Sequence, residues 1–201
     1  MTPRPLTVAI ATLSALTALT ACNGSPEAGH PNTTPTSPTA TPTPTAPSTP
    51  EWTPEETAAI TAAKARYVAA RAAVEKALAD PEALNRSGLE KAGNGGEWII
   101  AVIGDARFQE RNGWYQSGRA KIFTKKVVSV KLEIEQPEVL LSNCVDSSGV
   151  VTRFTRDDKP VPMGPGNGNR HLFSSRLVYA PPAPGGEKMW FLVSEKAAGK
   201  C

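Results

Sequence analysis

The feature that most constrains the fold of this chain is a change in the spacing of its apolar residues near Trp114. Before this point, the apolar residues recur every three or four positions, which is the spacing of one face of an α-helix. After it they follow a period of two, as in a strand with one buried face. Helices followed by a run of strands predict an α+β domain, with helices packed on an antiparallel sheet.

The longest expected helix covers residues 51–80 and opens with Thr53-Pro54-Glu55-Glu56. Thr53 can cap it, Pro54 suits the first position, and Glu56 completes a capping box. It should end at Asp80-Pro81, because proline has no N–H to donate. Larger apolar groups and alanines form the face expected to pack on the sheet: Ile60, Ala63, Tyr67, Ala70, Val74 and Leu78. Charged residues are assigned to the remaining surface: Lys64, Arg66, Arg71, Glu75 and Lys76.

The remaining elements of the domain follow from local signals. Shorter helices are expected at 82–91 and 97–111, the second ending at Asn112-Gly113. Strands are expected at 120–134, 139–145, 150–156, 171–180 and 189–195. Hairpin turns are expected at 146–149 and 181–186, and a loop at 157–170. Lys126 interrupts the apolar face of the first strand, which predicts a bulge or bend.

Residues 1–21 are typical of a signal peptide, with Arg4 before an apolar run shorter than the ~20 residues that a membrane-spanning helix needs. The end of this run, Leu19-Thr20-Ala21-Cys22, resembles the bacterial lipobox. The resemblance implies cleavage of the Ala21-Cys22 bond and a diacylglyceryl anchor on Cys22. The mature protein is then expected on the outer face of the cytoplasmic membrane. The alternatives are an ordinary secreted protein or a retained anchor helix.

Residues 22–50 are expected to form a disordered linker, because they are mainly Pro, Thr, Ser and Ala and offer little to bury. Repeated prolines favour an extended spacer that could reach on the order of 80 Å. A proline-motif ligand is the alternative role. The chain therefore divides into a signal peptide (1–21), a lipid-anchored linker (22–50) and a folded domain (51–201).

The chain contains three cysteines. If Cys22 carries lipid, Cys144 and Cys201 remain, and outside the cytoplasm such a pair most often forms a disulfide. Two free thiols or an active-site cysteine are the alternatives. No Cys-x-x-Cys motif is present and the two histidines lie far apart in the sequence, so we expect no metal and no cofactor.

The net charge of +3 is too small for a dedicated nucleic-acid-binding protein. The densest group of basic residues is interpreted as the solvated face of a strand, since Glu133 and Glu135 share that face. The alternative is a surface for an anionic partner. The group consists of Arg119, Lys121, Lys125, Lys126 and Lys131.

Several short motifs in the domain resemble one family. They are the Thr53-Pro54-Glu55-Glu56 opening, Arg66-Tyr67, the segment Asn143-Cys144-Val145-Asp146-Ser147, and 189–193 with the final cysteine. These resemble small secreted or lipid-anchored proteins of high-GC Gram-positive bacteria with a nuclear transport factor 2-like (SnoaL-like, cystatin-like) domain. The resemblance implies a curved sheet and helices that form a cone with a pocket. It implies no reaction, since many such domains are not enzymes.

Catalytic members of that family place a His/Asp pair or buried carboxylates inside the cone. His30 falls in the linker, and His171 is expected to be a solvated residue at the start of a strand. Its speculative partners are Asp105 and Asp146, although Asp146 is better suited to capping its own turn. Tryptophans are expected in the core. For the pair Trp114-Tyr115, the alternative is a position at the mouth of a pocket. The speculative pocket residues are therefore His171, Trp114 and Tyr115, and the core tryptophans include Trp98 and Trp190.

These observations favour a non-catalytic surface lipoprotein that binds a partner or supports an assembly of the cell envelope. Its expected partners are the membrane, through Cys22, and an envelope protein. One alternative is a cone-pocket enzyme or small-molecule binder of the SnoaL-like class. Another is an accessory subunit of an export or conjugation machine.

Overall fold

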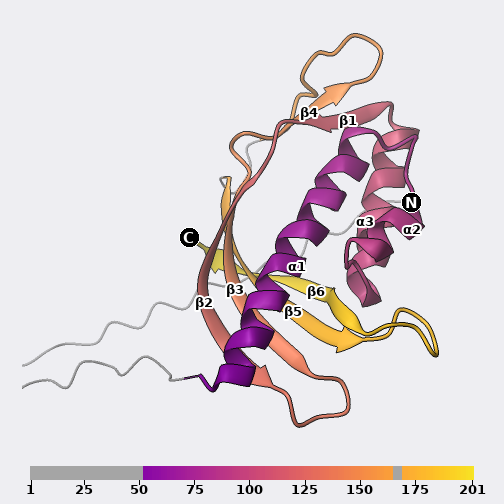
Figure 1. The fold of residues 1–201 in the computed structure, drawn as a ribbon. Coiled ribbons are helices and arrows are strands. Elements are labelled where there is room, and N and C mark those ends of the chain that lie inside the picture. Colours follow the sequence, from indigo (N-terminus) through magenta and orange to yellow (C-terminus); the bar gives the residue numbers. More distant parts are fainter. Residues whose placement is uncertain (1–51, 165–168) are drawn as a thin grey trace, which may run out of the picture. The chain divides into compact units, whose positions relative to one another are not determined.

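The computed structural model describes residues 52–164 and 169–201. It contains the helices α1 (Pro54–Ala79), α2 (Arg86–Lys91) and α3 (Gly96–Arg111), followed by strands. The strands are β1 (Trp114–Ser117), β2 (Lys121–Lys131), β3 (Glu138–Asp146), β4 (Val151–Phe154), β5 (Arg170–Ala180) and β6 (Met189–Lys200). The α+β architecture predicted from the sequence is thus confirmed (Figure 1).

The signal peptide, the linker, Cys22 and His30 lie outside the described residues. Within 52–164 and 169–201, no helix combines the length and the apolar character needed to cross a membrane.

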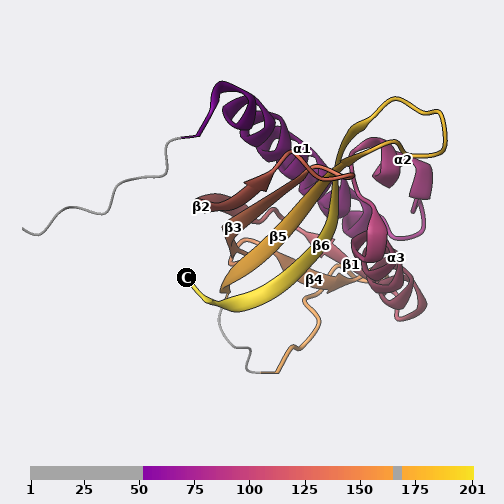
Figure 2. The same ribbon diagram turned by 90° about the horizontal axis from the view of Figure 1, so that it is seen from below.

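The larger sheet has the strand order β2-β3-β5-β6, with every neighbouring pair antiparallel. It curves around α1, which lies against its inner face, while α2 and α3 lie beside α1 (Figures 1 and 2). The small sheet pairs β1 with β4 and lies at one end of α1.

Helix α1 packs through the alanine-rich face expected from its sequence. Its buried residues are Ile60, Ala63, Tyr67, Ala70, Val74 and Ala77, spaced by three or four positions. Ala63, Tyr67 and Ala70 share a core cluster with side chains of β3, β5 and β6. The capping box is present, because the Glu56 backbone N–H donates to Thr53 Oγ1 (3.2 Å) and the Thr53 N–H donates to Glu56 Oε2 (2.9 Å).

Helix α2 begins four residues later than the expected start at residue 82. Asn85 caps it instead, by accepting the Gly88 backbone N–H at 3.1 Å. Helix α3 ends at Arg111 as expected, followed by Asn112 and by Gly113 at a φ of 62°.

The expected hairpin at 146–149 is wrong, because β4 does not pair with β3. Both edges of β3 are already occupied, by β2 and by β5. Residues 151–154 therefore pair with β1 in the separate sheet. Gly118 and Gly149 lie so close where the chain changes sheets that a Cβ on Gly118 would overlap the Gly149 carbonyl oxygen. The second expected hairpin, between β5 and β6, is confirmed.

Strand β2 differs from a regular alternating strand. Its register with β3 shifts between Thr124 and Lys126, which confirms the irregularity predicted at Lys126. A second shift follows between Val127 and Ser129. As a result Val127 contacts the core while the adjacent Val128 is exposed. The strand also ends at Lys131 rather than at residue 134.

Cys144 and Cys201 form a disulfide with a Cα–Cα distance of 5.9 Å, in agreement with the pairing expected from the sequence. Strand β5 lies between β3, which carries Cys144, and β6, which Cys201 follows. The bond therefore ties the residue after an edge strand to the interior of the sheet.

Candidate functional site

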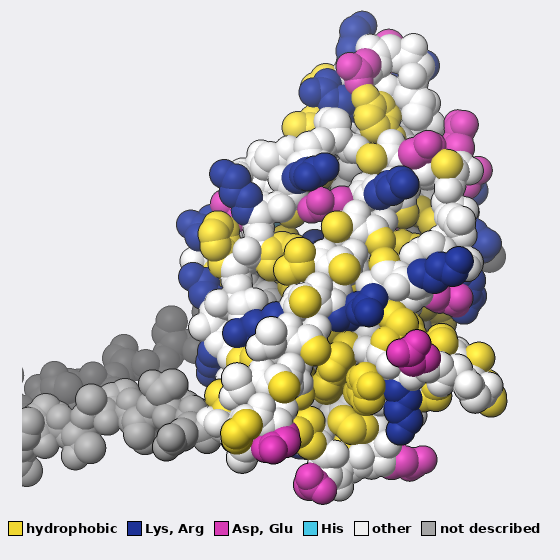
Figure 3. Space-filling view, viewed as in Figure 1, with side chains coloured by type: hydrophobic (Ala, Val, Ile, Leu, Met, Phe, Trp, Pro, Cys, Tyr) yellow, Lys and Arg dark blue, Asp and Glu magenta, His cyan; other side chains and the backbone are white. Residues whose placement is uncertain are grey.

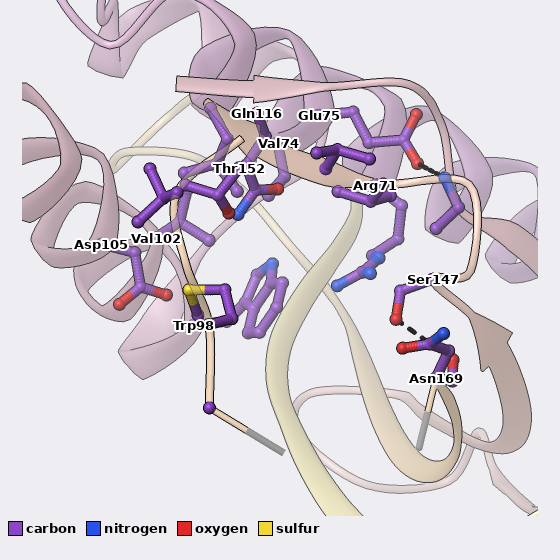
Figure 4. Close-up of a pocket in the computed structure, with 17 residues that line it drawn as sticks. Arg71, Val74, Glu75, Trp98, Val102, Asp105, Gln116, Ser147, Thr152 and Asn169 are labelled. Carbon is purple, nitrogen blue, oxygen red and sulfur yellow. Dashed lines mark hydrogen bonds between the residues drawn. The ribbon is translucent and has the colours of Figure 1, made fainter. Parts of the chain in front are cut away.

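A cavity of about 560 Å³ lies between α1, α3 and the small sheet. Figure 4 shows side chains from these elements pointing into it. One wall comes from α1, one from α3, one from β1 and β4, and the rest from Ala120 and from residues around 147–150, 161–164 and 169. Its apolar lining includes Val74, Leu78, Trp98, Val102, Val151 and Val161. Its polar lining consists of Arg71, Glu75, Asp105, Gln116, Ser147, Thr152 and Asn169.

Arg71 is held in the cavity wall by a buried ion pair. Its Nη1 donates to Glu195 Oε2 at 2.8 Å, and the Glu195 side chain is only 1% exposed. The Arg71 guanidinium also lies over the Trp98 ring, 5.6 Å from its centroid. These contacts leave the guanidinium little freedom to turn, so its position is set before any ligand binds.

Glu195 is the centre of a polar network between α1 and the sheet. The Tyr67 hydroxyl donates to Glu195 Oε1 at 2.6 Å, and the Ser175 hydroxyl donates to the same oxygen at 3.1 Å. Asn143 Nδ2 donates in turn to Ser175 Oγ at 3.0 Å. Burial, and then the Glu195 carboxylate, raises the pKa of the Tyr67 hydroxyl, which keeps it a neutral donor.

Trp98 is fixed from behind the cavity by Asn94. The indole N–H donates to Asn94 Oδ1 at 2.9 Å. Asn94 is fully buried, and its amide nitrogen donates to the carbonyl oxygens of Ala70 (3.2 Å) and Leu89 (3.1 Å). Trp98 packs against both hydrophobic core clusters, as expected of a core tryptophan, and its half-buried ring also lines the cavity.

Two carboxylates line the cavity from different helices. Glu75 on α1 accepts the Ala120 backbone N–H through Oε1 at 3.0 Å. Asp105 on α3 is a largely exposed residue at the rim, yet partial burial of its carboxyl raises its pKa. Of the speculative catalytic partners, Asp105 thus reaches the cavity. Asp146 accepts the Ser148 backbone N–H at 3.0 Å within its own turn, as expected.

The speculative pocket residues His171, Trp114 and Tyr115 do not line this cavity. His171 lies on β5 between Val145 and Lys200 and contacts the Phe173 ring edge-on at 6.4 Å. Trp114 packs between the rings of Phe108 and Phe154, 5.7 and 6.4 Å away. The Tyr115 hydroxyl donates to Asp158. Trp114 and Tyr115 border a separate, smaller hollow of about 320 Å³.

Arg71 and Glu75 line the cavity, whereas their positions in the sequence predicted the solvent-facing surface of the helix. One signal for Arg71 was present, because it follows Tyr67 by four positions and precedes Val74 by three, which is the spacing of the buried face. An arginine at such a position needs a buried acceptor. Glu195 lies 124 residues away in sequence, so helical spacing could not identify it.

The expected solvation of the basic residues on and before β2 agrees with the structure, because Arg119, Lys121, Lys125, Lys126 and Lys131 are all exposed. Figure 3 shows Lys and Arg side chains dispersed among acidic and hydrophobic ones over the visible face. The described part of the chain contains no group of three or more His, Cys, Asp or Glu residues that could hold a metal ion.

No model of a known protein family matches the chain, and no curated protein matches its sequence. The structure is similar to the crystal structure of the intermembrane space region of the chloroplast protein ARC6. The sequences are 8% identical, the match covers 75% of this chain and 100% of that chain, and the TM-score is 0.44. This similarity is too weak to indicate a function.

Proposed function

We propose that this protein is a lipid-anchored, extracytoplasmic binding protein whose cavity takes a small ligand with polar and apolar parts. The observation that carries the proposal is the cavity of about 560 Å³, with a preset Arg71 and the Trp98 indole in its wall. Ligand pockets commonly measure about 300–1,000 Å³ and combine apolar walls with a few fixed polar groups. The residues around this cavity have that composition.

A non-catalytic role is better supported than an enzyme of the same fold. A catalytic cone would require an acid/base set such as His171 with a nearby carboxylate. His171 lies elsewhere on β5, and Asp105 reaches the cavity without it. Glu195, Tyr67 and Ser175 form a buried network that positions Arg71.

We further propose that the curved sheet and α1 form a nuclear transport factor 2-like cone. The curvature of the β2-β3-β5-β6 sheet around α1 supports it. The proposed location of the protein is the outer face of the cytoplasmic membrane, and residues 22–50 are proposed as the spacer between the lipid and the domain. The disulfide supports an oxidising compartment, because such bonds are rare in the cytosol.

Replacing Cys22 by Ala should abolish incorporation of a labelled fatty acid into the protein. The variant should either be released into the medium or keep residues 1–21, because the sulfur that accepts lipid is absent. Metabolic labelling and intact mass measure both results. A variant that takes up as much label as the parent protein would contradict the anchor at Cys22.

The cavity can be tested with 4-phenylbutanol, a neutral probe with an aromatic body and one polar end. At about 0.3 kcal/mol per heavy atom, its Kd should be on the order of millimolar. Thr152→Trp should abolish binding, because the new ring occupies the cavity that Thr152 lines. Lys126→Trp, at an exposed position on β2, is the matched control and should bind normally. Ligand-observed NMR measures binding, and equal binding by both variants would contradict the cavity site.

A further inference from the structure

We propose that the ligand of this cavity is an organic cation, an ammonium group carried on an apolar body. The inference rests on the proposed function and names the chemical class of its ligand. It follows from the charges around the cavity, which consist of one arginine with a built-in counterion and two carboxylates without one.

Arg71, the cation among the residues that line the cavity, is already neutralised. Its Nη1 lies 2.8 Å from Glu195 Oε2, and the Glu195 side chain is almost completely excluded from solvent. Tyr67 and Ser175 both donate to the other Glu195 oxygen, so the carboxylate is held against the guanidinium. An anionic ligand would therefore compete with a fixed internal counterion for this cation.

Glu75 and Asp105 carry the uncompensated charge. Neither forms an ion pair within residues 52–164 and 169–201. The hydrogen bond that Glu75 accepts from the Ala120 N–H uses Oε1. The two residues approach the cavity from different helices and lie on different sides of it (Figure 4). The side chains that line the cavity thus carry a net negative charge.

The environment of Asp105 also favours a cationic ligand. Desolvation is the cause that raises the pKa of its carboxyl, and no cation of the described chain offsets this effect. A ligand ammonium within about 4–6 Å would supply the missing opposite charge. Binding would then stabilise the carboxylate that the protein alone leaves partly desolvated.

The apolar lining of the cavity favours a ligand whose remaining part is hydrocarbon. Trp98 and Val102 on α3, together with Val151 and Val161, form a hydrophobic wall beside the carboxylates. Burying hydrocarbon here contributes roughly 25 cal/mol per Å². A hydrated metal ion or a small polar amine could not use this wall, whereas an aryl or alkyl ammonium could.

The test compares 4-phenylbutylammonium, 4-phenylbutanol and 4-phenylbutyrate, which share one body and differ in charge. Isothermal titration uses the full chain carrying Cys22→Ala, so that no detergent is needed. We expect the ammonium to bind about tenfold more tightly than the alcohol, and the carboxylate more weakly than both. In Glu75→Gln/Asp105→Asn, the ammonium preference should fall to within about twofold. Glu110→Gln, on α3 but outside this cavity, should keep the tenfold preference.

The outcomes separate this inference from the proposed function. Equal or tighter binding of 4-phenylbutyrate would overturn the cation while leaving the cavity as a binding site. An ammonium preference that survives in the double variant would overturn the roles of Glu75 and Asp105. If none of the three probes binds, or if Thr152→Trp binds all of them normally, the cavity site itself is wrong. Far-UV circular dichroism establishes that each variant is folded.

Discussion

Replacing Glu195 by Gln is expected to lower the free energy of unfolding by about 3–5 kcal/mol, the usual cost of removing one partner from a buried ion pair. Gln keeps the shape of the side chain and an oxygen that can accept from Tyr67. It removes the charge that balances Arg71, whose side chain is 15% exposed. The large effect therefore comes from an uncompensated guanidinium in the wall of the cavity. Urea denaturation measures it as a lower midpoint with an unchanged slope.

Two further variants test this explanation. Arg71→Met/Glu195→Gln removes both charges and should recover most of the lost stability, because neither charge is then left buried without its partner. Glu138→Gln disrupts the pair between Glu138 and Arg176, whose arginine is 47% exposed, and should cost only about 0–1 kcal/mol. A double variant as unstable as the sum of its single changes would show that the charges are not coupled.

Replacing Cys201 by Ser is expected to lower the free energy of unfolding by about 4 kcal/mol in the chain-entropy description. The bond spans 57 residues, and without it the unfolded chain gains conformations that the closed loop excluded. Cys201 is the better position to change, since it is exposed whereas Cys144 is fully buried. Thermal unfolding with and without dithiothreitol measures the effect.

Treatment with dithiothreitol is the control, because it breaks the disulfide of the parent protein without a mutation. It should lower the unfolding temperature of the parent protein to that of Cys201→Ser and leave the variant unchanged. Because Cys201 directly follows β6, the first local loss should be exchange protection of the end of that strand beside His171 and Leu172. A variant as stable as the oxidised parent would contradict a stabilising role for the bond.

The ends of helix α1 could be predicted from the sequence, because the interactions that determine them lie within one helical turn. The capping box of Thr53 and Glu56 and the end of α1 before Pro81 depend on residues three or four positions apart. The hairpin predicted at 146–149 does not form, for a different reason. Its turn residues favour a hairpin, but β5 occupies the edge of β3 that β4 would need.

The candidate site was less predictable than the helices. Asp105 was named from its residue type, and it does reach the cavity. Trp114, Tyr115 and His171 were chosen from their positions at element boundaries, and the structure places them away from it. Arg71 was missed because its counterion lies on β6, beyond the reach of any helical spacing.

By itself, the sequence determined the α+β class and the amphipathic face of α1, and it favoured the pairing of the two cysteines in the domain. These depend on side-chain periodicity, local hydrogen bonds and residue type. Tertiary structure alone decided that β4 leaves the main sheet, that Glu195 neutralises Arg71, and that Glu75 and Asp105 share one cavity. Charge balance and strand pairing depend on which distant segments meet, and packing of the whole domain determines those contacts.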